Sequence, residues 1–549
     1  MLLRKAARTE HLASFHIYNC TIGLMSTQDR TLASSSQAKG ACDGYINLKE
    51  PTDLEDGVAA HQGGAPIYTS PQVLAVLAHY FSVGLVYGAL PFLPYAVLVN
   101  YFHVSGAEFT SAKGLIQLGW SFKVFVGMLS DALPIMGYRR KSYMMLGWFI
   151  AGTCLLVLAL LNHGEPYNPS STSKKGPFNV GAVVNGNRVG LLCALVTIGY
   201  IVADAPADAM VVEYAQREPQ HLRGRMHMLA YGVRTTASVL TTLVVGICLN
   251  SQKYQGSFTW DMGLNNMFVV LCVPSFLTTL ITYVFVQDNK VARGLEWIDY
   301  WTQLWALVQR RCVWQLMLFN FFFHLFGFYC TTTAAPYVLS DWARLENLDY
   351  AALLAISTVV FVTVFATWGL SWNWRTFLVL STIGISLLNA VAMYLTIYDY
   401  VRNQWIYFGV VFVDHLPLAV QLITSMVVAA QIADDDNQGV VVGLLTSCAN
   451  LAAPVGAMIT NGISSQFRIK DLQYDDNDDT RNQVATSYAI YYGFTAVAAC
   501  LVVFFPANKK MLQEWTQEGA LYPKVGAATL IVGVLLLIAA VTSNLLTMF

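Results

Sequence analysis

The chain has 549 residues, of which 55% are hydrophobic and only 12% carry a charge. Soluble domains carry about twice that charged fraction, so the composition excludes an ordinary soluble domain and indicates an integral membrane protein. A formal net charge of -1 without a basic domain argues against a nucleic-acid partner. The 10 cysteines are spread singly with no CxxC pair, so no metal site, disulfide framework or cofactor is expected.

Residues 1–70 are polar and lack hydrophobic periodicity, which predicts a disordered cytosolic tail. The first residues are basic, as in a transit peptide, but Glu10 and weak amphipathicity argue against that role. Whether translation starts at Met1 or at Met25 is left open.

Apolar runs long enough to cross a bilayer of ~30 Å follow in chain order. Six predicted spans form an N-terminal half over 71–286, and six more form a C-terminal half over 312–506. Between them lies 287–311, an amphipathic linker expected on the cytosolic membrane surface. The spans are predicted at 72–102, 106–130, 142–162, 188–214, 226–250, 264–286, 312–338, 349–371, 375–398, 405–431, 439–463 and 486–506.

The C-terminal extension, 507–549, contains a further apolar run over 526–547. This run is either a thirteenth membrane helix or a peripheral one. Six spans, a longer loop and six more spans are typical of a transporter built from two repeats. The predicted fold class is therefore all-α, a polytopic membrane protein of major-facilitator-like 6+6 architecture.

Lysine and arginine are more frequent in the loops that face the cytosol if the N-terminus is cytosolic. We therefore expect the N-terminus to be cytosolic. The protein is expected to be a multi-pass monomer in the plasma membrane or an internal membrane. Prolines add a second pattern, because they free backbone carbonyls that a water-filled cavity can satisfy. Interior prolines fall in the first and fourth predicted spans of each half, which line the cavity of two-half carriers: Pro91, Pro94, Pro206, Pro336 and Pro417. Of the other eight spans, only the sixth and the eleventh contain one, at Pro274 and Pro454.

Four charged residues fall inside predicted spans. Asp204 and Asp208 are one turn apart on one face of the fourth span. Lys123 in the second span and Arg234 in the fifth lie at a similar depth from the same membrane face. Because isolated charges are costly in lipid, the sequence predicts that the four neutralise one another. The cluster then serves either packing and gating or direct substrate contact; separate water-facing charges are the remaining alternative.

Aromatic side chains on the expected cavity helices offer flat surfaces to a planar ligand. Tyr87, Tyr95, Phe322 and Tyr329 are the chosen candidates, and each is otherwise a core or lipid-facing ring. Asp414 and His324 are candidates for proton coupling, since buried acids and histidines titrate within reach of physiological pH. The alternative for both is a hydrogen-bonded residue between helices.

The stretch GWSFKVFVGMLSDALPIMGYRRKSY joins the second and third predicted spans. Its ordered glycines and charges resemble the loop 2–3 signature of the major facilitator superfamily. This resemblance implies a gating loop that latches against neighbouring helix ends. The residues that carry it are Gly127, Asp131, Gly137, Arg139 and Arg140.

Three further stretches narrow the resemblance: YIVADAPADAMVVEYAQREPQHLRG, NQWIYFGVVFVDHLPL and GLLTSCANLAAPVGA. Together, over roughly 72–506, they resemble the folate–biopterin transporter family, in its oomycete-type branch. The resemblance implies secondary transport of folate or biopterin by alternating access, with proton coupling left open. A pterin ring can donate hydrogen bonds to a carboxylate, and an anionic folate tail suits Arg or Lys.

The chain departs from that family at the tenth and eleventh spans, where acidic residues are expected. Gln431 and Gln438 stand there instead, beside Asp434 to Asp436, which leaves ion coupling in doubt.

Other classes of function remain as alternatives. A major-facilitator carrier of another small organic anion or nutrient shares the architecture, and a receptor or scaffold is more remote. Membrane prenyltransferases also place a DxxxD pair on a helix to hold magnesium. Only Asp434 to Asp436 offer the second aspartate motif such an enzyme needs, and the six-plus-six topology does not fit, so no enzyme is expected.

Overall fold

The computed structural model describes residues 66–168, 178–218, 225–290, 297–368, 372–407, 438–469 and 476–549, with single positions between 408 and 437. The predicted tail, 1–70, lies almost wholly outside these ranges. The chain divides into two compact units: Met1–Ile67 with Glu213–Met226, and Tyr68–Val212 with His227–Phe549. In the first unit, the Glu218 carboxylate accepts the backbone N–H groups of Arg225 and Met226, at 3.0 and 2.7 Å.

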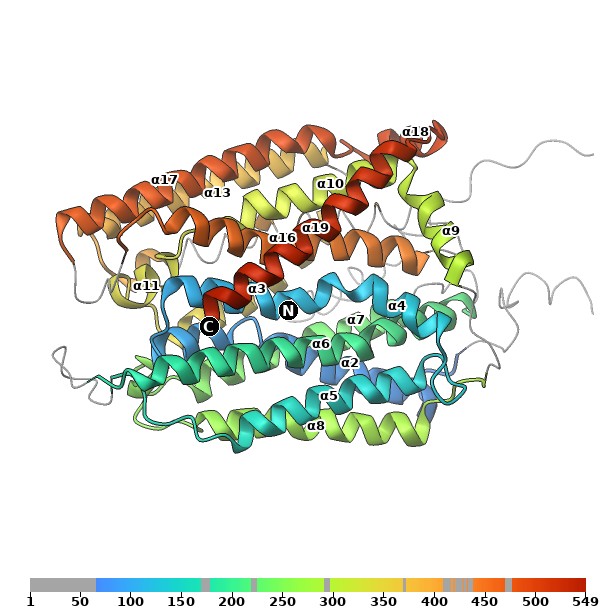
Figure 1. Ribbon diagram of the computed structural model, residues 1–549, viewed down its shortest axis with the longest axis horizontal. Coiled ribbons are helices and arrows are strands. Elements are labelled where there is room, and N and C mark those ends of the chain that lie inside the picture. The colour runs from blue at the N-terminus through green and yellow to red at the C-terminus, as the bar shows by residue number, and fades with distance from the viewer. Residues whose placement is uncertain are drawn as a thin grey trace, which may run out of the picture. The chain divides into compact units, whose positions relative to one another are not determined.

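Within the described ranges the chain is helical, with isolated β-bridges and no strand (Figure 1). Ten helical stretches of this part are long and apolar enough to cross a membrane. They are α2 (Pro71–Ala89), α5 (Lys141–Leu160), α6 (Gly181–Gln216), α7 (Arg225–Cys248), α8 (Leu264–Phe285), α10 with η5 (Arg311–Tyr329), α13 (Trp374–Ile397), α16 (Gln438–Ser464), α17 (Asp478–Leu501) and α19 (Pro523–Met548). The prediction of an all-α polytopic membrane protein is confirmed.

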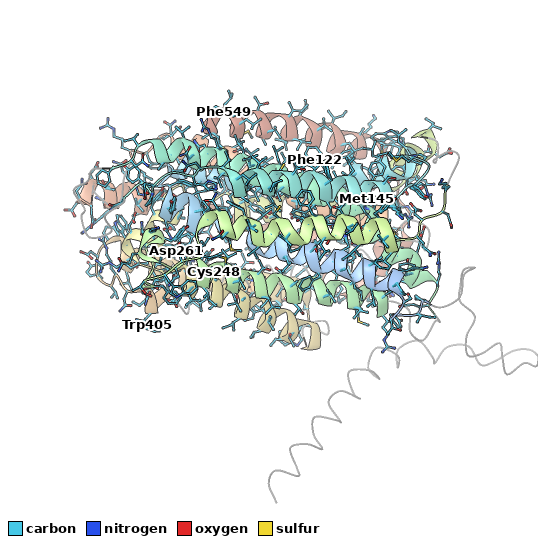
Figure 2. All side chains as sticks on the ribbon, turned by 90° about the horizontal axis from the view of Figure 1, so that it is seen from below. Phe122, Met145, Cys248, Asp261, Trp405 and Phe549 are labelled. Atoms are coloured by element: carbon cyan, nitrogen blue, oxygen red, sulfur yellow. The ribbon has the colours of Figure 1, made fainter. Side chains whose placement is uncertain are left out.

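The remaining described helices fall in other predicted segments. The second predicted span consists of α3 (Gly106–Ser121) and α4 (Lys123–Ala132), separated at Phe122, which Figure 2 labels. The eighth is α12 (Asn347–Trp368), and the tenth, 405–431, lies mostly outside the described residues. Two shorter helices, α9 (Trp297–Val308) and α18 (Lys509–Gln517), lie in the linker and the C-terminal extension. We call α2 to α8 the N-terminal group and α10 to α17 the C-terminal group.

Two of the predicted cavity spans are interrupted where their prolines fall. The helix α2 ends at Ala89, just before Pro91 and Pro94, and the chain resumes as the π-helix η2 (Tyr95–Tyr101). In the seventh span, α10 (Arg311–His324) and η5 (Leu325–Tyr329) are followed by the short α11 (Ala335–Tyr337), which has Pro336 in its first turn, and by η6 (Val338–Trp342). Proline lacks a backbone N–H and its ring clashes with the preceding turn, so regular helix stops before Pro91. Pro336 instead opens α11 after the break at 330–334, at a position that tolerates the missing N–H. By contrast, α6 continues through Pro206.

The helix α17 starts at Asp478, well before the predicted boundary at residue 486. Asn477 caps it by accepting the backbone N–H of Thr480 at 2.9 Å, and Asp478 and Asp479 lie in the first turn. Caps and acidic residues stabilise a helix N-terminus in water. Hydropathy locates only the membrane-buried part of a helix, so its polar first turns escaped the prediction.

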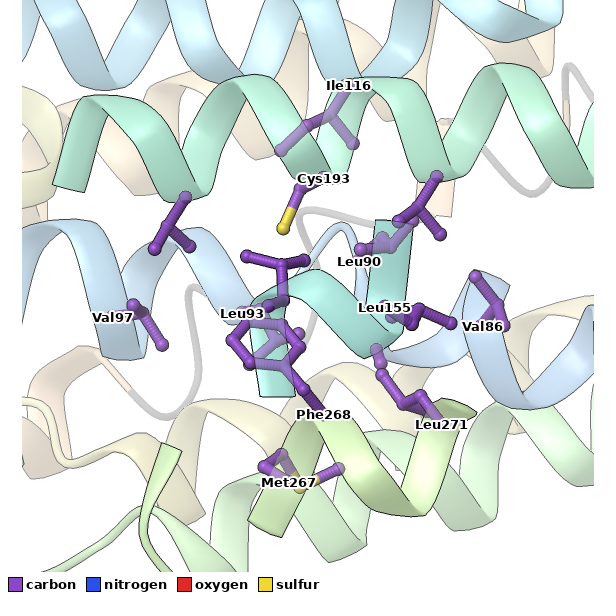
Figure 3. Packing of buried hydrophobic residues seen from close by; sticks show 14 of the residues in the cluster. Val86, Leu90, Leu93, Val97, Ile116, Leu155, Cys193, Met267, Phe268 and Leu271 are labelled. Carbon is purple, nitrogen blue, oxygen red and sulfur yellow. The ribbon is translucent and has the colours of Figure 1, made fainter. Parts of the chain in front are cut away.

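Helices distant in sequence pack side by side in the second unit. Figure 1 shows α5 alongside α8, and α19 running across both α16 and α3. The largest apolar cluster joins residues of α2, η2, α3, α5, α6, α7 and α8, among others. Figure 3 shows Leu93, Ile116, Leu155, Cys193 and Phe268 converging in it. Glycine allows the closest approaches: a Cβ on Gly147 of α5 would lie 2.4 Å from the backbone nitrogen of Ala203 in α6.

The two groups are joined by hydrogen bonds at one end, which we call the distal end and define by Asn100, Asn250 and Asn347. The Asn100 amide donates to Asn347 Oδ1 at 2.8 Å, and the Asn347 amide donates to the Leu249 carbonyl at 2.7 Å. Asn250 donates to Glu346 Oε2 at 2.9 Å. Asn250 and Asn347 are fully buried. The boundary between the two groups, which we call the seam, is therefore closed at the distal end.

An ion network joins α13 to α17 at the same end. Asp476 accepts hydrogen bonds from Arg402 and from Arg481, the latter at 2.7 Å, and both arginines also pair with Asp399. Burial alone would raise the pKa of Asp476, but the hydrogen bonds from Arg402 and Arg481 outweigh burial and lower it to about 2. The folded pKa is thus below the unfolded value of about 4, so this stabilisation is full above pH 4 and disappears only as the pH falls towards 2.

We predict that Gly147→Ala lowers the free energy of unfolding by about 1–3 kcal/mol, because the new methyl group overlaps the α6 backbone. The melting temperature of the purified protein measures this. The matched control is Gly533→Ala on α19, where a Cβ meets no atom within 4 Å. Equal melting temperatures for both variants would contradict the α5–α6 packing.

Asp476→Asn is expected to lower stability by about 1 kcal/mol, and by the same amount at pH 5 and pH 8, because Asp476 stays ionised over that range. Thermal unfolding at the two pH values tests this. Glu514→Gln on α18 serves as control, since that side chain is exposed and lies outside this ion network. A stability loss that differs between pH 5 and pH 8 would contradict the assignment.

Candidate functional site

A buried charge cluster links α4 and α6. The Lys123 ammonium lies 2.7 Å from Asp204 Oδ2 and 2.6 Å from Asp208 Oδ2. The three side chains are 10%, 0% and 19% exposed. Asp204 and Asp208 face the same direction because they are one turn apart on α6, and Lys123 is the first residue of α4, after the break at Phe122. The structure therefore brings together three of the four residues predicted to neutralise one another.

The two carboxylates differ in their remaining contacts. Asp208 accepts hydrogen bonds from the hydroxyl groups of Tyr80, on α2, and of Tyr231, on α7. Asp204 Oδ2 is held by Lys123, whereas Asp204 Oδ1 has no hydrogen-bond partner within the described part of the chain. Asp208 is thus fully engaged, and Asp204 keeps one free acceptor.

The fourth predicted residue, Arg234 on α7, has a different environment. Its guanidinium carbon lies 5.0 Å from the ring centre of Tyr87, 5.2 Å from that of Trp120 and 5.1 Å from that of Tyr231. These are cation–π distances. Among the described residues Arg234 forms no ion pair with a carboxylate. A half-buried guanidinium framed by aromatic faces therefore has its hydrogen-bond donors available.

The backbone holds Arg234 close to α2. A Cβ on Gly84 would lie 2.3 Å from the Arg234 carbonyl oxygen and 2.7 Å from Ala237 Cβ. Only glycine permits this approach, which sets the distance from Arg234 to Tyr87, one turn further along α2.

Trp120 and Tyr231 are site residues that the sequence analysis missed. Trp120 also lies 5.1 Å from the Lys123 ammonium, and its indole N–H donates to the Tyr200 hydroxyl at 2.8 Å. Each of these rings precedes a membrane-buried cation by three residues, a spacing that shares a helix face. This three-residue spacing from Lys123 and Arg234 is the feature of the sequence that could have identified both rings.

The other predicted aromatics are dispersed. Tyr87 packs edge-on against Trp120 and so belongs to the Arg234 surroundings. Tyr95 lies in the distal seam, where its hydroxyl donates to the Leu345 carbonyl at 2.9 Å. Phe322 stacks on Phe326, and Tyr329 contacts α16, where its carbonyl accepts the Thr460 hydroxyl.

Of the two residues predicted for proton coupling, the structure describes only His324. His324 is buried, and its ring Nδ1 lies 2.7 Å from the Asn320 carbonyl, one turn earlier on α10. Asp414 lies outside the described residues, as do Gln431 and Asp434 to Asp436. Both coupling roles stay predictions.

The residues of the predicted gating loop begin on α4, with Gly127 and Asp131, and continue past its end. Gly127 on α4 has open space beside it, and Gly137 adopts a positive φ of 83° in the turn after Asp131. The Asp288 carboxylate accepts the backbone N–H of Arg140 at 2.8 Å and thereby satisfies the start of α5. Arg139 is half-buried beside it. The described residues contain no group of His, Cys, Asp and Glu arranged to hold a metal ion.

This arrangement of helices is shared with solved membrane transporters. A D-xylose–proton symporter superposes with a TM-score of 0.54 over 80% of this chain and 99% of its own, at 13% identity. The nucleoside transporter NupG gives 0.54 over 79% and 99%, at 11% identity. These similarities show the fold: the chain is a multi-pass helical membrane protein with the helix arrangement of these transporters.

Sequence comparison identifies the family that the chain resembles. The model of the BT1 family matches residues 85–174. The folate-biopterin transporter of Synechocystis sp. is 21% identical over 427 residues, 75% of this chain and 78% of the relative. Folate transporter 1 of Plasmodium falciparum is 36% identical over 69 residues, 13% of this chain and 14% of the relative. The predicted resemblance to folate–biopterin transporters is confirmed, and these relatives are transporters, not enzymes.

We predict that Lys123→Met destabilises the protein by about 3–5 kcal/mol, because it leaves two buried carboxylates without a cation. Adding Asp204→Asn should recover part of that loss, since the remaining acid keeps its tyrosine donors. Melting temperatures of the two variants test this. If the double variant is no more stable than Lys123→Met alone, the ion pair does not govern stability.

Proposed function

We propose that this protein carries a folate- or biopterin-type pteridine across the membrane by alternating access. The names of the matched relatives support the substrate class, and the fold supports the transport mode. The observation that carries the proposal is the environment of Arg234, a guanidinium with three aromatic neighbours and no carboxylate partner in the described chain.

The chemistry of such a ligand fits the contacts around Arg234. A guanidinium binds a carboxylate through two parallel hydrogen bonds, which the anionic tail of folate would accept. The pteridine ring is flat and would lie against Tyr87 and Trp120. The free Oδ1 of Asp204 would accept a ring N–H or amino group. The proposed hydrogen bond to Asp204 uses an oxygen that has no partner among the described residues.

The charges around this site sum to zero, since Lys123 and Arg234 balance Asp204 and Asp208. A carboxylate that enters brings one uncompensated negative charge into a poorly hydrated region. A proton that enters with the substrate would restore neutrality. His324 and Asp414 remain the proposed groups for such coupling, and an N-terminus in the cytosol remains the proposed orientation.

Alternating access requires the closed distal seam to part. In the proposed cycle, the N-terminal and C-terminal groups rock so that the site opens to one side at a time. In this cycle, the hydrogen bonds among Asn100, Asn347, Asn250 and Glu346 stabilise the state in which substrate cannot enter from the distal side.

A carrier of another aromatic acid is the second candidate function. A guanidinium beside aromatic rings would also bind an aromatic carboxylate without a pteridine ring. The uptake experiment therefore includes such a compound as competitor.

Uptake of tritiated folate and biopterin in a folate-auxotrophic host, with and without a proton gradient, tests the proposal. We expect uptake of both compounds, and at least about tenfold less folate uptake in Arg234→Gln, since one charge-assisted bidentate contact is lost. Biopterin has no carboxylate and should lose less. Arg234→Lys should recover folate uptake only partly, because an ammonium lacks the planar fork.

The matched control is Arg188→Gln, an exposed arginine on α6, which should transport normally. A wild-type protein that takes up neither compound, or an aromatic acid that competes better than folate, would overturn the pteridine assignment.

A further inference from the structure

The helix α19 lies outside the twelve-span plan and crosses the seam between the two helix groups. Figure 1 shows it running obliquely from the α18 end over α16 to α3, and it contacts both of these helices. Because α3 belongs to the N-terminal group and α16 to the C-terminal group, α19 is in contact with both sides of the seam.

The chain just before α19 is fixed to the start of α10. The backbone N–H of Tyr522 donates to the Gln309 carbonyl at 2.8 Å, and that of Arg311 donates to the Ala520 carbonyl at 3.1 Å. Arg311 also pairs with Glu518 at 2.8 Å. The first end of α19 therefore moves with the C-terminal group.

Further along, α19 is held to α16 by a buried amide. The Asn544 side chain is fully buried and donates hydrogen bonds to the carbonyls of Pro454 and Ala540, both at 2.8 Å. Pro454 lies inside α16. An asparagine on a helix whose other faces are mostly apolar and exposed is costly in lipid unless its amide is satisfied by another helix. Asn544 therefore specifies where α19 rests on α16.

The last turn of α19 is held to the N-terminal group. The Met548 carbonyl accepts the Asn187 amide of α6 at 3.1 Å, and the same amide donates to Glu108 Oε1 of α3 at 2.6 Å. The Met548 side chain is 3% exposed and belongs to the largest apolar cluster of the N-terminal group. Asn544 and Met548, only four positions apart on α19, thus anchor it to different groups.

We propose that α19 is a strap that favours the state with a closed distal seam. This inference rests on the proposed alternating access, in which the groups move relative to each other. Asn187 and Glu108 lie near the distal ends of α6 and α3, so parting the distal seam moves them away from Pro454. Since α19 is anchored to both, that motion breaks the Asn544 or the Met548 contact. The strap therefore sets the equilibrium between the two states without touching substrate.

Electron–electron distance measurements on the full-length protein in lipid nanodiscs test the strap directly. Spin labels at Glu165→Cys and Asp478→Cys report on the two groups at the distal end, where both side chains are exposed. The background lacks the reactive native cysteines. In Asn544→Leu, the fraction with long label distances should rise about fivefold, the factor associated with one buried hydrogen bond. The control, Leu546→Ala, alters a side chain that is 74% exposed and should leave the distances unchanged.

Unchanged distances in Asn544→Leu, or an equal shift in Leu546→Ala, would overturn the strap. A chain that ends at Gly519, before α19, provides a second variant and should shift the distances at least as far. Folate uptake by the wild-type protein is measured in parallel. If the wild-type protein takes up folate but the label distances in Asn544→Leu are unchanged, only the strap is contradicted. If the distances shift in Asn544→Leu but the wild-type protein takes up no folate, only the proposed substrate is contradicted.

Discussion

One lysine in the membrane interior organises the N-terminal group. Lys123 neutralises two carboxylates on α6, and Tyr80 and Tyr231 bring α2 and α7 to the same point through Asp208. Four helices therefore converge on a single ammonium. In a low-dielectric environment such an arrangement tolerates few rearrangements, because every displaced partner leaves a buried charge exposed to lipid. The group is accordingly suited to move as a rigid body.

The same lysine explains why Arg234 is available. If Arg234 paired with Asp208, the site would contain two satisfied ion pairs and little affinity for an anion. Lys123 takes both carboxylates instead, so the second cation is balanced only at longer range and is framed by aromatic rings. Lys123 thus neutralises the acids, and in the proposed function a different cation, Arg234, binds the anionic ligand.

The sequence predicted the fold well because bilayer thickness dictates span length and spacing. It also placed Lys123, Asp204 and Asp208 together, since depth along a helix follows from residue count. It did not resolve which cation pairs with which acid, because that choice depends on helix rotation and on neighbours such as Trp120. Tyr95 faces the distal seam because the π-helix after Pro94 changes the register of the first span. The sequence also could not predict the contacts of α19, since Asn544 looks like an isolated polar residue in an apolar run.

The contact between Gly84 and the backbone of Arg234 means that the geometry of the proposed ligand site is partly encoded in the main chain. The separation of α2 and α7 sets how far the guanidinium stands from the Tyr87 ring, which it contacts directly at 5.0 Å. A relative with alanine at this position would have to separate the two helices and so move the guanidinium away from the ring, even with every neighbouring side chain preserved. Exchanging side chains alone would then fail to transplant the selectivity of one carrier into another.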